Sequence, residues 1–340
     1  MFTPKYALSG HLLKNITQIE RLYGQLESLH IPKQLELNLE RNNLIQSSYI
    51  SNSIEGNPLS LPEVTNLLLD ERIPVNRHEK EVSNYYHLLQ NLGNFLTDDT
   101  SLKTVAEIHK KLLSGVNDTI AGQIRNKQVI IGNYVTINGE KELRIKHNPP
   151  FHTSKEITEV LKGLLRWSSV ENEIPAILKI GIFHHEFVYI HPFIDGNGRV
   201  CRLLTALLFL QNKYLINKYF VIDDYYDVDR HLYSDSLHSA DSGDKTVWLE
   251  YFSDGVKYSL QSALVKFEQQ LKNTNVSQRP SPREKEVLTL FEKIKELTSQ
   301  DIAEALHVSR QQAHSLVKGL YNKGLINKKG STKGSYYFIK

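Results

Sequence analysis

A polar segment with two glycines, at residues 191–202, joins two apolar stretches of the chain and restricts the fold more than any other feature. It reads His-Pro-Phe-Ile-Asp-Gly-Asn-Gly-Arg-Val-Cys-Arg, and the apolar periodicity on either side predicts helices at 175–189 and 198–212. Gly196 and Gly198 allow backbone N–H groups to turn inward at the start of the second helix, where the helix dipole favours an anion. The sequence therefore predicts a helix–loop–helix unit built around an anion site.

The charged side chains of this segment indicate phosphate chemistry. Arg199 and Arg202 lie three residues apart in the first helical turn, where they repel each other and oppose the dipole unless an anion lies between them. Asp195 offers a hard oxygen ligand for an Mg²⁺ ion that is also bound by phosphate groups. His191 can accept a proton near neutral pH. A base, a metal ligand and a phosphate clamp are thus predicted within one short segment.

The segment resembles the signature of the Fic family, H-x-F-x-[DE]-G-N-G-R-x-x-R, and fills each of its fixed positions. The family usually transfers AMP from ATP to a Ser, Thr or Tyr hydroxyl of a protein. The resemblance implies a mainly α protein with a Fic-type helical domain, in which His191 is the catalytic base and Asp195 holds Mg²⁺. The residues that it implies for binding phosphate are Gly196, Asn197, Gly198, Arg199 and Arg202. The chain itself is one candidate for the protein substrate.

A second motif lies far upstream. Residues 51–56, Ser-Asn-Ser-Ile-Glu-Gly, resemble the inhibitory motif [ST]-x-x-x-E-[GN] of many Fic proteins, with Ser51 and Glu55 at its fixed positions. The resemblance implies that Glu55 pairs with Arg202 in the same chain and obstructs the γ-phosphate site, which a carboxylate–guanidinium contact is suited to do. Two alternatives stay open: a solvated Ser and Glu at a helix end, and a Glu55 that activates water to remove AMP.

A β-hairpin is predicted at 128–146, because two β-prone runs flank Asn138 and Gly139. In Fic proteins such a flap binds the target segment by main-chain pairing, a form of β-strand addition. Residues 230–237 resemble the family's adenine-pocket helix, which implies that Tyr233 contacts the nucleotide. A half-buried core tyrosine is the alternative.

The C-terminal part of the chain has a different charge from the rest. Residues 281–340 contain 11 Lys and Arg against 6 Asp and Glu, a local charge of +5, so the first 280 residues carry 3 − 5 = −2. The helical and strand patterns of 283–340 resemble winged helix-turn-helix domains, whose second helix enters the DNA major groove. The exposed candidates on that helix are Arg310, Gln311, Gln312, His314 and Ser315. DNA and a protein are both open as partners.

Composition excludes several classes of protein. A single cysteine, Cys201, excludes an intramolecular disulfide framework and a Cys-rich zinc site. The longest apolar run, 203–210, is too short to span a bilayer, and no secretory leader is evident at the N-terminus. We therefore predict a cytoplasmic protein without a membrane segment, with homodimer formation as an expectation.

The predicted organisation combines these elements. It comprises an N-terminal helical region at 1–110 with an inhibitory helix at about 40–56, a Fic core with its flap at 111–271, a linker at 272–282 and a winged helix at 283–340. The predicted function is a self-inhibited protein adenylyltransferase that uses ATP and Mg²⁺. The alternatives are a DNA-binding regulator with a nucleotide-sensing Fic domain, and transfer of a different nucleotide or phosphoryl-containing group.

Overall fold

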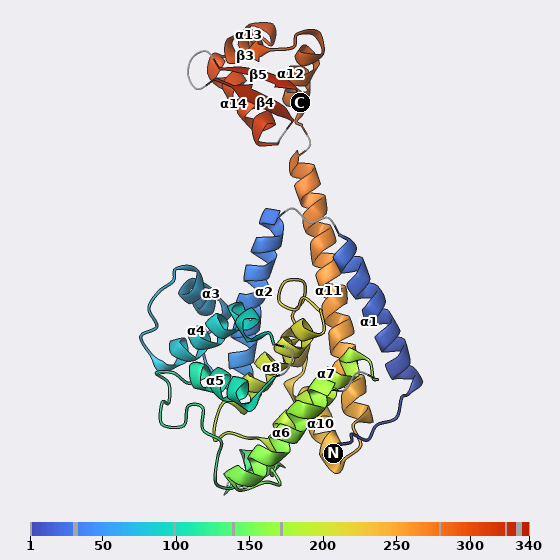
Figure 1. Cartoon of the computed structure of the whole chain (residues 1–340). Helices are drawn as coiled ribbons and strands as arrows, with labels where there is room; N and C mark the ends of the chain where they lie inside the picture. The colour runs from blue at the N-terminus through green and yellow to red at the C-terminus, as the bar shows by residue number, and fades with distance from the viewer. Residues whose placement is uncertain are drawn as a thin grey trace. The chain divides into compact units, whose positions relative to one another are not determined.

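Helices dominate the structure, and the strands form two small antiparallel sheets, which confirms the predicted mainly α fold class (Figure 1). The chain divides into two compact units, residues 1–264 and residues 265–340. The computed structural model describes residues 2–29, 33–97, 100–137, 140–170, 173–278, 280–323, 325–330 and 335–339.

Two apolar helices, α7 (Ala176–Ile190) and α8 (Asn197–Gln211), form the centre of the first unit (Figure 1). Most side chains of both are buried, because the helices are apolar around their whole circumference and not along one stripe. A glycine at 181 lets α11 (Thr246–Gln278) approach, since a Cβ there would lie 2.9 Å from the side chains of Leu249 and Phe252. The loop between α7 and α8 carries the motif at 191–202.

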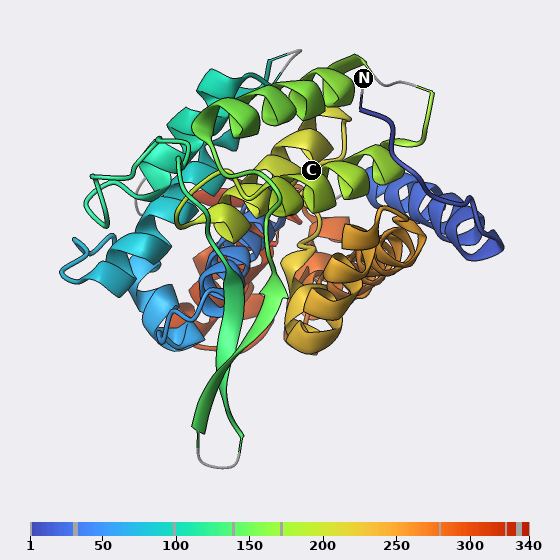
Figure 2. The ribbon, with the colours of Figure 1, turned by 90° about the horizontal axis from the view of Figure 1, so that it is seen from below.

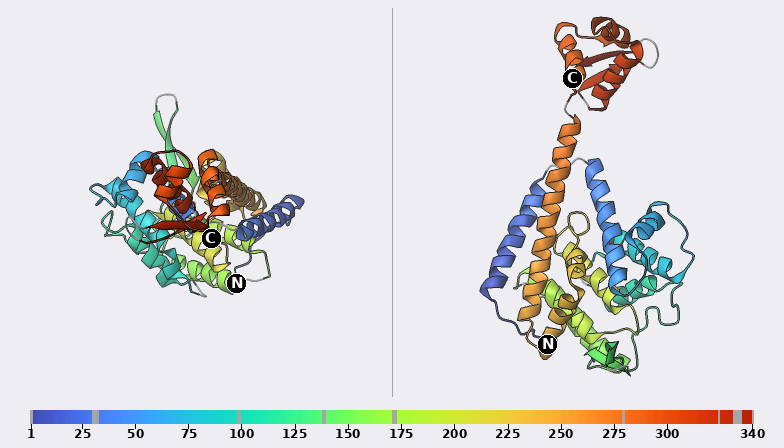
Figure 3. Two further views of the ribbon diagram at one scale, coloured as in Figure 1. Left: turned by 90° about the horizontal axis from the view of Figure 1, so that it is seen from above. Right: turned by 180° about the vertical axis from the view of Figure 1, so that it is seen from behind.

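The other helices of the first unit pack around this pair. They are α1 (Gly10–Ser28), α2 (Lys33–Ile54), α3 (Leu61–Leu69), α4 (Arg77–Gln90), α5 (Leu102–Leu112), α6 (Ser154–Val170), α9 (Asp223–Val228) and α10 (Arg230–Ser239), with the 3₁₀ turns η1 (Leu92–Phe95) and η2 (Ala240–Ser242). Helix α1 lies beside the first part of α11, where Asn15 donates to Ser253 Oγ at 2.9 Å (Figures 1 and 3). Helix α2 packs against α4, α8 and α9, so its C-terminal end is fixed from several sides.

Helix α2 ends at Ile54, shortly before Gly56 and Pro58. Gly56 adopts φ 85°, a left-handed conformation that suits glycine at a helix end. Ser51 and Asn52, in the last turn, are almost fully buried. One side of the last turn of α2 therefore faces the interior of the unit.

The predicted hairpin is present as β1 (Ile131–Ile137) and β2 (Glu140–His147), paired antiparallel with Ile137 opposite Glu140. Figure 2 shows its strands extending away from the surrounding helices. The predicted turn residues Asn138 and Gly139 lie outside the described residues. Main-chain groups along the two strands are thus presented beyond the helical body.

The second unit contains α12 (Pro282–Lys293), α13 (Ser299–Ala305) and α14 (Arg310–Asn322), with the strands β3 (Leu297–Thr298), β4 (Ile326–Lys329) and β5 (Tyr336–Ile339) in the order β3-β5-β4. Its three helices begin with capping boxes, in which an N-cap hydroxyl and the side chain three residues later satisfy the first backbone N–H groups. Val287, Ile302, Val317 and Tyr337 form part of its core. The predicted basic loop falls at 331–334, outside the described residues.

The predicted linker at 272–282 needs a correction. Helix α11 continues to Gln278, and α12 begins at Pro282. Residues 272–278 are mostly polar but contain neither proline nor glycine, so nothing in them ends a helix before Pro280. Among the described helices, none has both the length and the apolar content that crossing a bilayer requires.

Candidate active site

His191 ends α7 in a left-handed backbone conformation, with φ 49° and ψ 64°. This conformation costs a non-glycine residue about 1–3 kcal/mol, so the surroundings must hold it in place. The buried guanidinium of Arg125 donates to the carbonyl oxygens of His191 at 2.6 Å and Ile190 at 3.2 Å. The backbone N–H of Arg125 also donates to the Pro192 carbonyl at 2.9 Å. Arg125, to which the sequence assigned no role, therefore fixes the histidine.

The imidazole of His191 has a defined tautomer. Its Nδ1 lies 3.3 Å from the carbonyl oxygen of Val188. Because a carbonyl only accepts, Nδ1 carries the hydrogen and Nε2 carries the lone pair. Burial of the ring, together with the neighbouring His147, lowers the pKa of His191 to about 4. The ring is therefore neutral near pH 7 and can accept a proton at Nε2.

The loop that follows is closed by side chains. Asn197 Oδ1 accepts from the Phe193 N–H at 2.8 Å, and Asn197 Nδ2 donates to the Phe193 carbonyl at 2.8 Å. His109 stacks on the Phe193 ring at 3.7 Å between centroids; its Nε2 donates to the Asp195 carbonyl at 3.1 Å, while its Nδ1 accepts from the Gly122 N–H. The side chain of Asn197 is thus occupied within the loop, and only its backbone can serve the predicted phosphate cradle.

The N-terminus of α8 is already in contact with a carboxylate. Gly196 takes φ 79° at the N-cap, which brings the first backbone N–H groups of α8 toward one side. A Cβ added to Gly198 would overlap Oε1 of Glu55, so this carboxylate lies directly against the glycine. An anion is favoured at such a position by the helix dipole. Glu55, with a side chain that is 32% exposed, therefore occupies an anion site.

Arg202 holds both fixed residues of the upstream motif. Its Nε donates to Ser51 Oγ at 2.7 Å, and one Nη donates to the Ser51 carbonyl at 2.9 Å and to Glu55 Oε1 at 2.7 Å. Partial burial acts to raise the pKa of Glu55, but Arg202 outweighs it, so the pKa lies below the ordinary carboxyl value. Glu55 is therefore a carboxylate paired with Arg202 near pH 7.

Arg199 is buried and incompletely paired. One Nη lies 3.4 Å from Asn52 Oδ1 and 3.7 Å from Glu81 Oε1. Its Nε is buried without a hydrogen-bond partner among the described residues. A buried guanidinium N–H in this state suits an additional acceptor, and a phosphate oxygen is an acceptor of the right charge.

Asp195 is the most accessible charged group of the motif, with a side chain 39% exposed. Its Oδ1 accepts the Gly196 N–H at 2.6 Å, and its carboxylate lies 3.7 Å from both Arg77 and Arg199. Mg²⁺ is usually held by one or two carboxylates together with substrate phosphates. A single accessible carboxylate beside an anion site fits this ligand set.

Residues 99–209 match the Fic/DOC family, and the match includes α5, both strands of the hairpin and most of the α7–α8 pair. These residues form a Fic/DOC domain. Helix α2 and Glu55, which directly follows it, precede the Fic/DOC domain in the chain, and the second unit follows that domain.

Curated proteins with similar sequences share this domain. The chain is 25% identical over 262 residues to the protein adenylyltransferase Fic of Culex quinquefasciatus, which covers 73% of this chain and 47% of that protein. It is 28% identical over 225 residues to the protein adenylyltransferase fic-1 of Caenorhabditis elegans, covering 63% and 40%. The chain thus spans about half the length of the curated relatives or less.

Solved structures are similar in fold. A Fic family protein from Desulfovibrio desulfuricans superposes with a TM-score of 0.67 at 22% identity, covering 100% of this chain and 98% of that one. A fragment of Fic-1 from C. elegans gives a TM-score of 0.61 at 25% identity, covering 76% and 73%. The similarity to the first structure extends beyond the Fic/DOC domain.

Tyr233, the predicted nucleotide contact, is packed among aromatic side chains. This side chain is 7% exposed, and its ring stacks on Tyr226 at 4.3 Å between centroids. Its hydroxyl lies 3.1 Å from Nε2 of His184, whose pKa is lowered to about 3 by burial. Tyr233 also interacts electrostatically with Arg202 of the motif, and its contact with the nucleotide stays a prediction.

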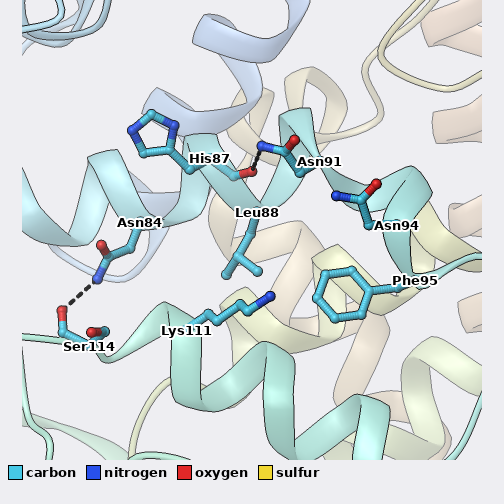
Figure 4. A pocket seen from close by; sticks show the side chains of 8 residues that line it. All are labelled: Asn84, His87, Leu88, Asn91, Asn94, Phe95, Lys111 and Ser114. Carbon is cyan, nitrogen blue, oxygen red and sulfur yellow. Dashed lines mark hydrogen bonds between the residues drawn. The ribbon is translucent and has the colours of Figure 1, made fainter.

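A pocket of about 400 Å³ lies among α4, η1 and α5 (Figure 4). Asn84 donates its amide to the carbonyls of Leu112 and Ser114, and Lys111 Nζ lies 4.9 Å from the centre of the Phe95 ring. The pocket is lined by Asn84, His87, Leu88, Asn91, Asn94, Phe95, Lys111 and Ser114. None of these belongs to the 191–202 motif, so the candidate active site of the Fic/DOC domain lies elsewhere.

Proposed function

We propose that this chain is a self-inhibited protein adenylyltransferase, which transfers AMP from ATP to a Ser, Thr or Tyr hydroxyl of a protein, itself included. The observation that carries the proposal is the neutral His191 ring at the start of an anion-binding helix with two buried arginines, Arg199 and Arg202. The names of the curated relatives support the same activity.

In the proposed reaction, Nε2 of His191 accepts the proton of the target hydroxyl. The hydroxyl oxygen forms a bond to the α-phosphorus of ATP as the bond from that phosphorus to the α–β bridging oxygen breaks, and pyrophosphate leaves. The first N–H groups of α8, with Arg199 and Arg202, hold the phosphates in line with the attack. Asp195 would hold Mg²⁺, which would neutralise phosphate charge.

Inhibition follows from competition for one site. Glu55 and the γ-phosphate would both need Arg202 and the space beside Gly198, so ATP cannot take its productive position while Glu55 is in place. Arg230, at the start of α10, donates to the carbonyl oxygen of Ser53 at 3.0 Å and to its Oγ at 2.9 Å. This clasp helps to hold the end of α2 in the inhibiting position.

The type of group transferred is tested with labelled ATP. The Glu55→Gly variant is incubated with Mg²⁺ and either α-³²P-ATP or γ-³²P-ATP, and the protein is separated on a denaturing gel. Transfer of AMP places label on protein from α-³²P-ATP only. Label from γ-³²P-ATP would contradict the proposal in favour of phosphoryl transfer. Label only from another α-³²P nucleotide would reassign the donor.

The low pKa of His191 predicts how activity depends on pH. Burial lowers the pKa of His191 to about 4, so the protonated, inactive ring forms only in acid. Activity therefore increases as the pH rises past about 4 and reaches its plateau before pH 6.5. We expect kcat/KM of the Glu55→Gly variant to fall only below about pH 5. With an unperturbed histidine as the base, kcat/KM would already fall near pH 6.5. Initial rates of label incorporation between about pH 4.5 and about pH 8 check this. An acid limb centred near 6.5 would contradict it.

We further propose that the second unit is a winged helix that selects the partner. Support comes from its element order and from the exposure of one face of α14, where Arg310, Gln311, Gln312, His314 and Ser315 are all exposed. DNA and a protein both stay open as the partner of this face. Homodimer formation and a cytoplasmic location stay predictions from the sequence.

A further inference from the structure

Three side chains of types that can ligate metals meet at the base of the hairpin, outside the phosphate site. His147 ends β2, His238 lies in α10 and Asp241 lies in η2. Nδ1 of His147 lies 2.8 Å from Asp241 Oδ2, and Nδ1 of His238 lies 3.1 Å from the same oxygen. The three ligand atoms lie within 4.8 Å of one another. His147, distant in sequence from the other two, thus joins His238 at one carboxylate oxygen of Asp241.

The hydrogen bonds of His147 leave an imbalance in this cluster. Its Nε2 lies 3.0 Å from the carbonyl oxygen of Tyr189, which only accepts, so Nε2 carries a hydrogen. In the neutral ring Nδ1 is then an acceptor, yet it faces the Asp241 carboxylate, which also only accepts. Two acceptors at 2.8 Å need a positive species between them. Either a second proton on His147 or a metal ion can supply it.

The surroundings of the cluster match the outer partners of a metal site. Ligating histidines usually donate their other N–H to a backbone carbonyl or carboxylate, as His147 does to Tyr189. Nε2 of His185 lies 3.0 Å from Asp241 Oδ1, while its Nδ1 accepts from Lys245 Nζ at 3.0 Å, so Nε2 is the donor. Asp241 Oδ1 is thereby occupied, and Oδ2 is left to the two imidazoles.

The carboxylate stays ionised in this setting. Burial acts to raise the pKa of Asp241, but its contacts with the imidazoles of His147, His185 and His238 outweigh burial and hold the pKa well below the ordinary value. The side chains of His147, His238 and Asp241 are 3%, 20% and 25% exposed. An ion can therefore reach the cluster from the side of His238.

We propose that His147, His238 and Asp241 bind a divalent transition-metal ion, with Zn²⁺ the best match. Two imidazole nitrogens and one carboxylate oxygen form the three-ligand set of open zinc sites, with the fourth position left to water or another ligand. At Zn–ligand distances of about 2.0–2.2 Å, tetrahedral ligands lie about 3.4 Å apart. The two separations from Asp241 Oδ2, 2.8 Å to His147 and 3.1 Å to His238, are shorter than this and need to widen when the ion binds. Mg²⁺ is a poor candidate because it prefers oxygen ligands.

The site would connect the hairpin to the helical body. A metal ion there joins the last residue of β2 to α10 and η2, and the rings of His147 and His191 lie 6.4 Å apart between centroids. The ion replaces the second proton that His147 otherwise needs. Binding at this site does not depend on the proposed transfer reaction, so the two can fail separately.

Direct metal binding tests the proposal. The full chain without an affinity tag is stripped with a chelator, kept in excess Mg²⁺ to occupy Asp195, and titrated with Zn²⁺ against a chromophoric chelator. We expect one equivalent of Zn²⁺ to bind, with affinity lowered at least about tenfold in His238→Ala and in Asp241→Asn. His231→Ala is the matched control, because His231 is exposed on the same helix and lies outside the cluster. Circular dichroism verifies that each variant is folded.

Co²⁺ provides a second readout. A site with two histidines and one carboxylate is expected to give the visible absorption of four-coordinate Co²⁺, and His238→Ala is expected to remove it. Equal Zn²⁺ affinity in the wild type, His238→Ala and Asp241→Asn would overturn the proposal. So would a wild type that binds no Zn²⁺, in which case a doubly protonated His147 balances the carboxylate.

Discussion

Replacing Glu55 by glycine is expected to raise the rate of AMP transfer about 100-fold, equivalent to ~2.7 kcal/mol. The substitution removes the carboxylate that lies against Gly198 and frees Arg202 to meet the γ-phosphate. The remaining contacts of Arg202, to the Oγ and carbonyl of Ser51, keep its guanidinium in place. The measurement is the initial rate of label incorporation from α-³²P-ATP at matched protein concentration.

Two further variants separate charge from helix effects in this experiment. Glu55→Gln keeps the size of the side chain but removes the charge-assisted bond, so an intermediate rate is expected. Glu40→Gln, a change of the same kind earlier in α2, is expected to leave the rate unchanged. Equal rates for the wild type and Glu55→Gly at saturating ATP would show that Glu55 does not obstruct the site.

In the Glu55→Gly background, replacing His191 by alanine is expected to lower the rate by about 10²- to 10⁴-fold, the usual contribution of a general base. The substitution removes the imidazole and with it Nε2, the atom that can accept a proton while Nδ1 donates to the Val188 carbonyl. Affinity for ATP is expected to change little, because the arginines and the start of α8 are untouched. Equilibrium binding of ATP and single-turnover rates measure the two effects separately.

The controls for His191 address its backbone conformation. Asparagine tolerates the left-handed region better than other non-glycine residues, so His191→Asn removes the base with less strain and is expected to be as inactive as the alanine variant. His152→Ala, at an exposed histidine, is expected to retain full activity. Substantial activity in His191→Asn would assign the proton transfer to another group.

The sequence alone could predict the local framework of the site. The alternation of apolar helices with a glycine-containing loop is a short-range pattern, and α7, the loop and α8 follow it closely. The pairing of Glu55 with Arg202 spans 147 residues and was implied by resemblance only, and the structure has this contact at 2.7 Å. The predicted hairpin is also present as two paired strands.

Other features depend on contacts that no spacing reveals. Arg125, His109 and Glu81 occur singly in unremarkable surroundings in the sequence, yet they hold the backbone at His191, support the loop and approach Arg199. Each acts through a partner 66, 86 or 118 positions away, and a single charged or imidazole side chain gives no sequence signal of such a contact. The brief Gly-Gln-Ile-Arg run before the hairpin was the available hint for Arg125.

The sequence by itself determined the chemistry of the loop, since base, carboxylate, glycines and arginines lie within one segment and their order is a covalent property. Only the tertiary structure decided which side chains stay available. It commits the Asn197 amide to Phe193, encloses Tyr233 in the core, and brings His147 of β2 to Asp241 of η2. These outcomes depend on which hydrogen-bond partners and apolar surfaces meet when distant elements pack, and buried polar groups must find such partners wherever the fold places them.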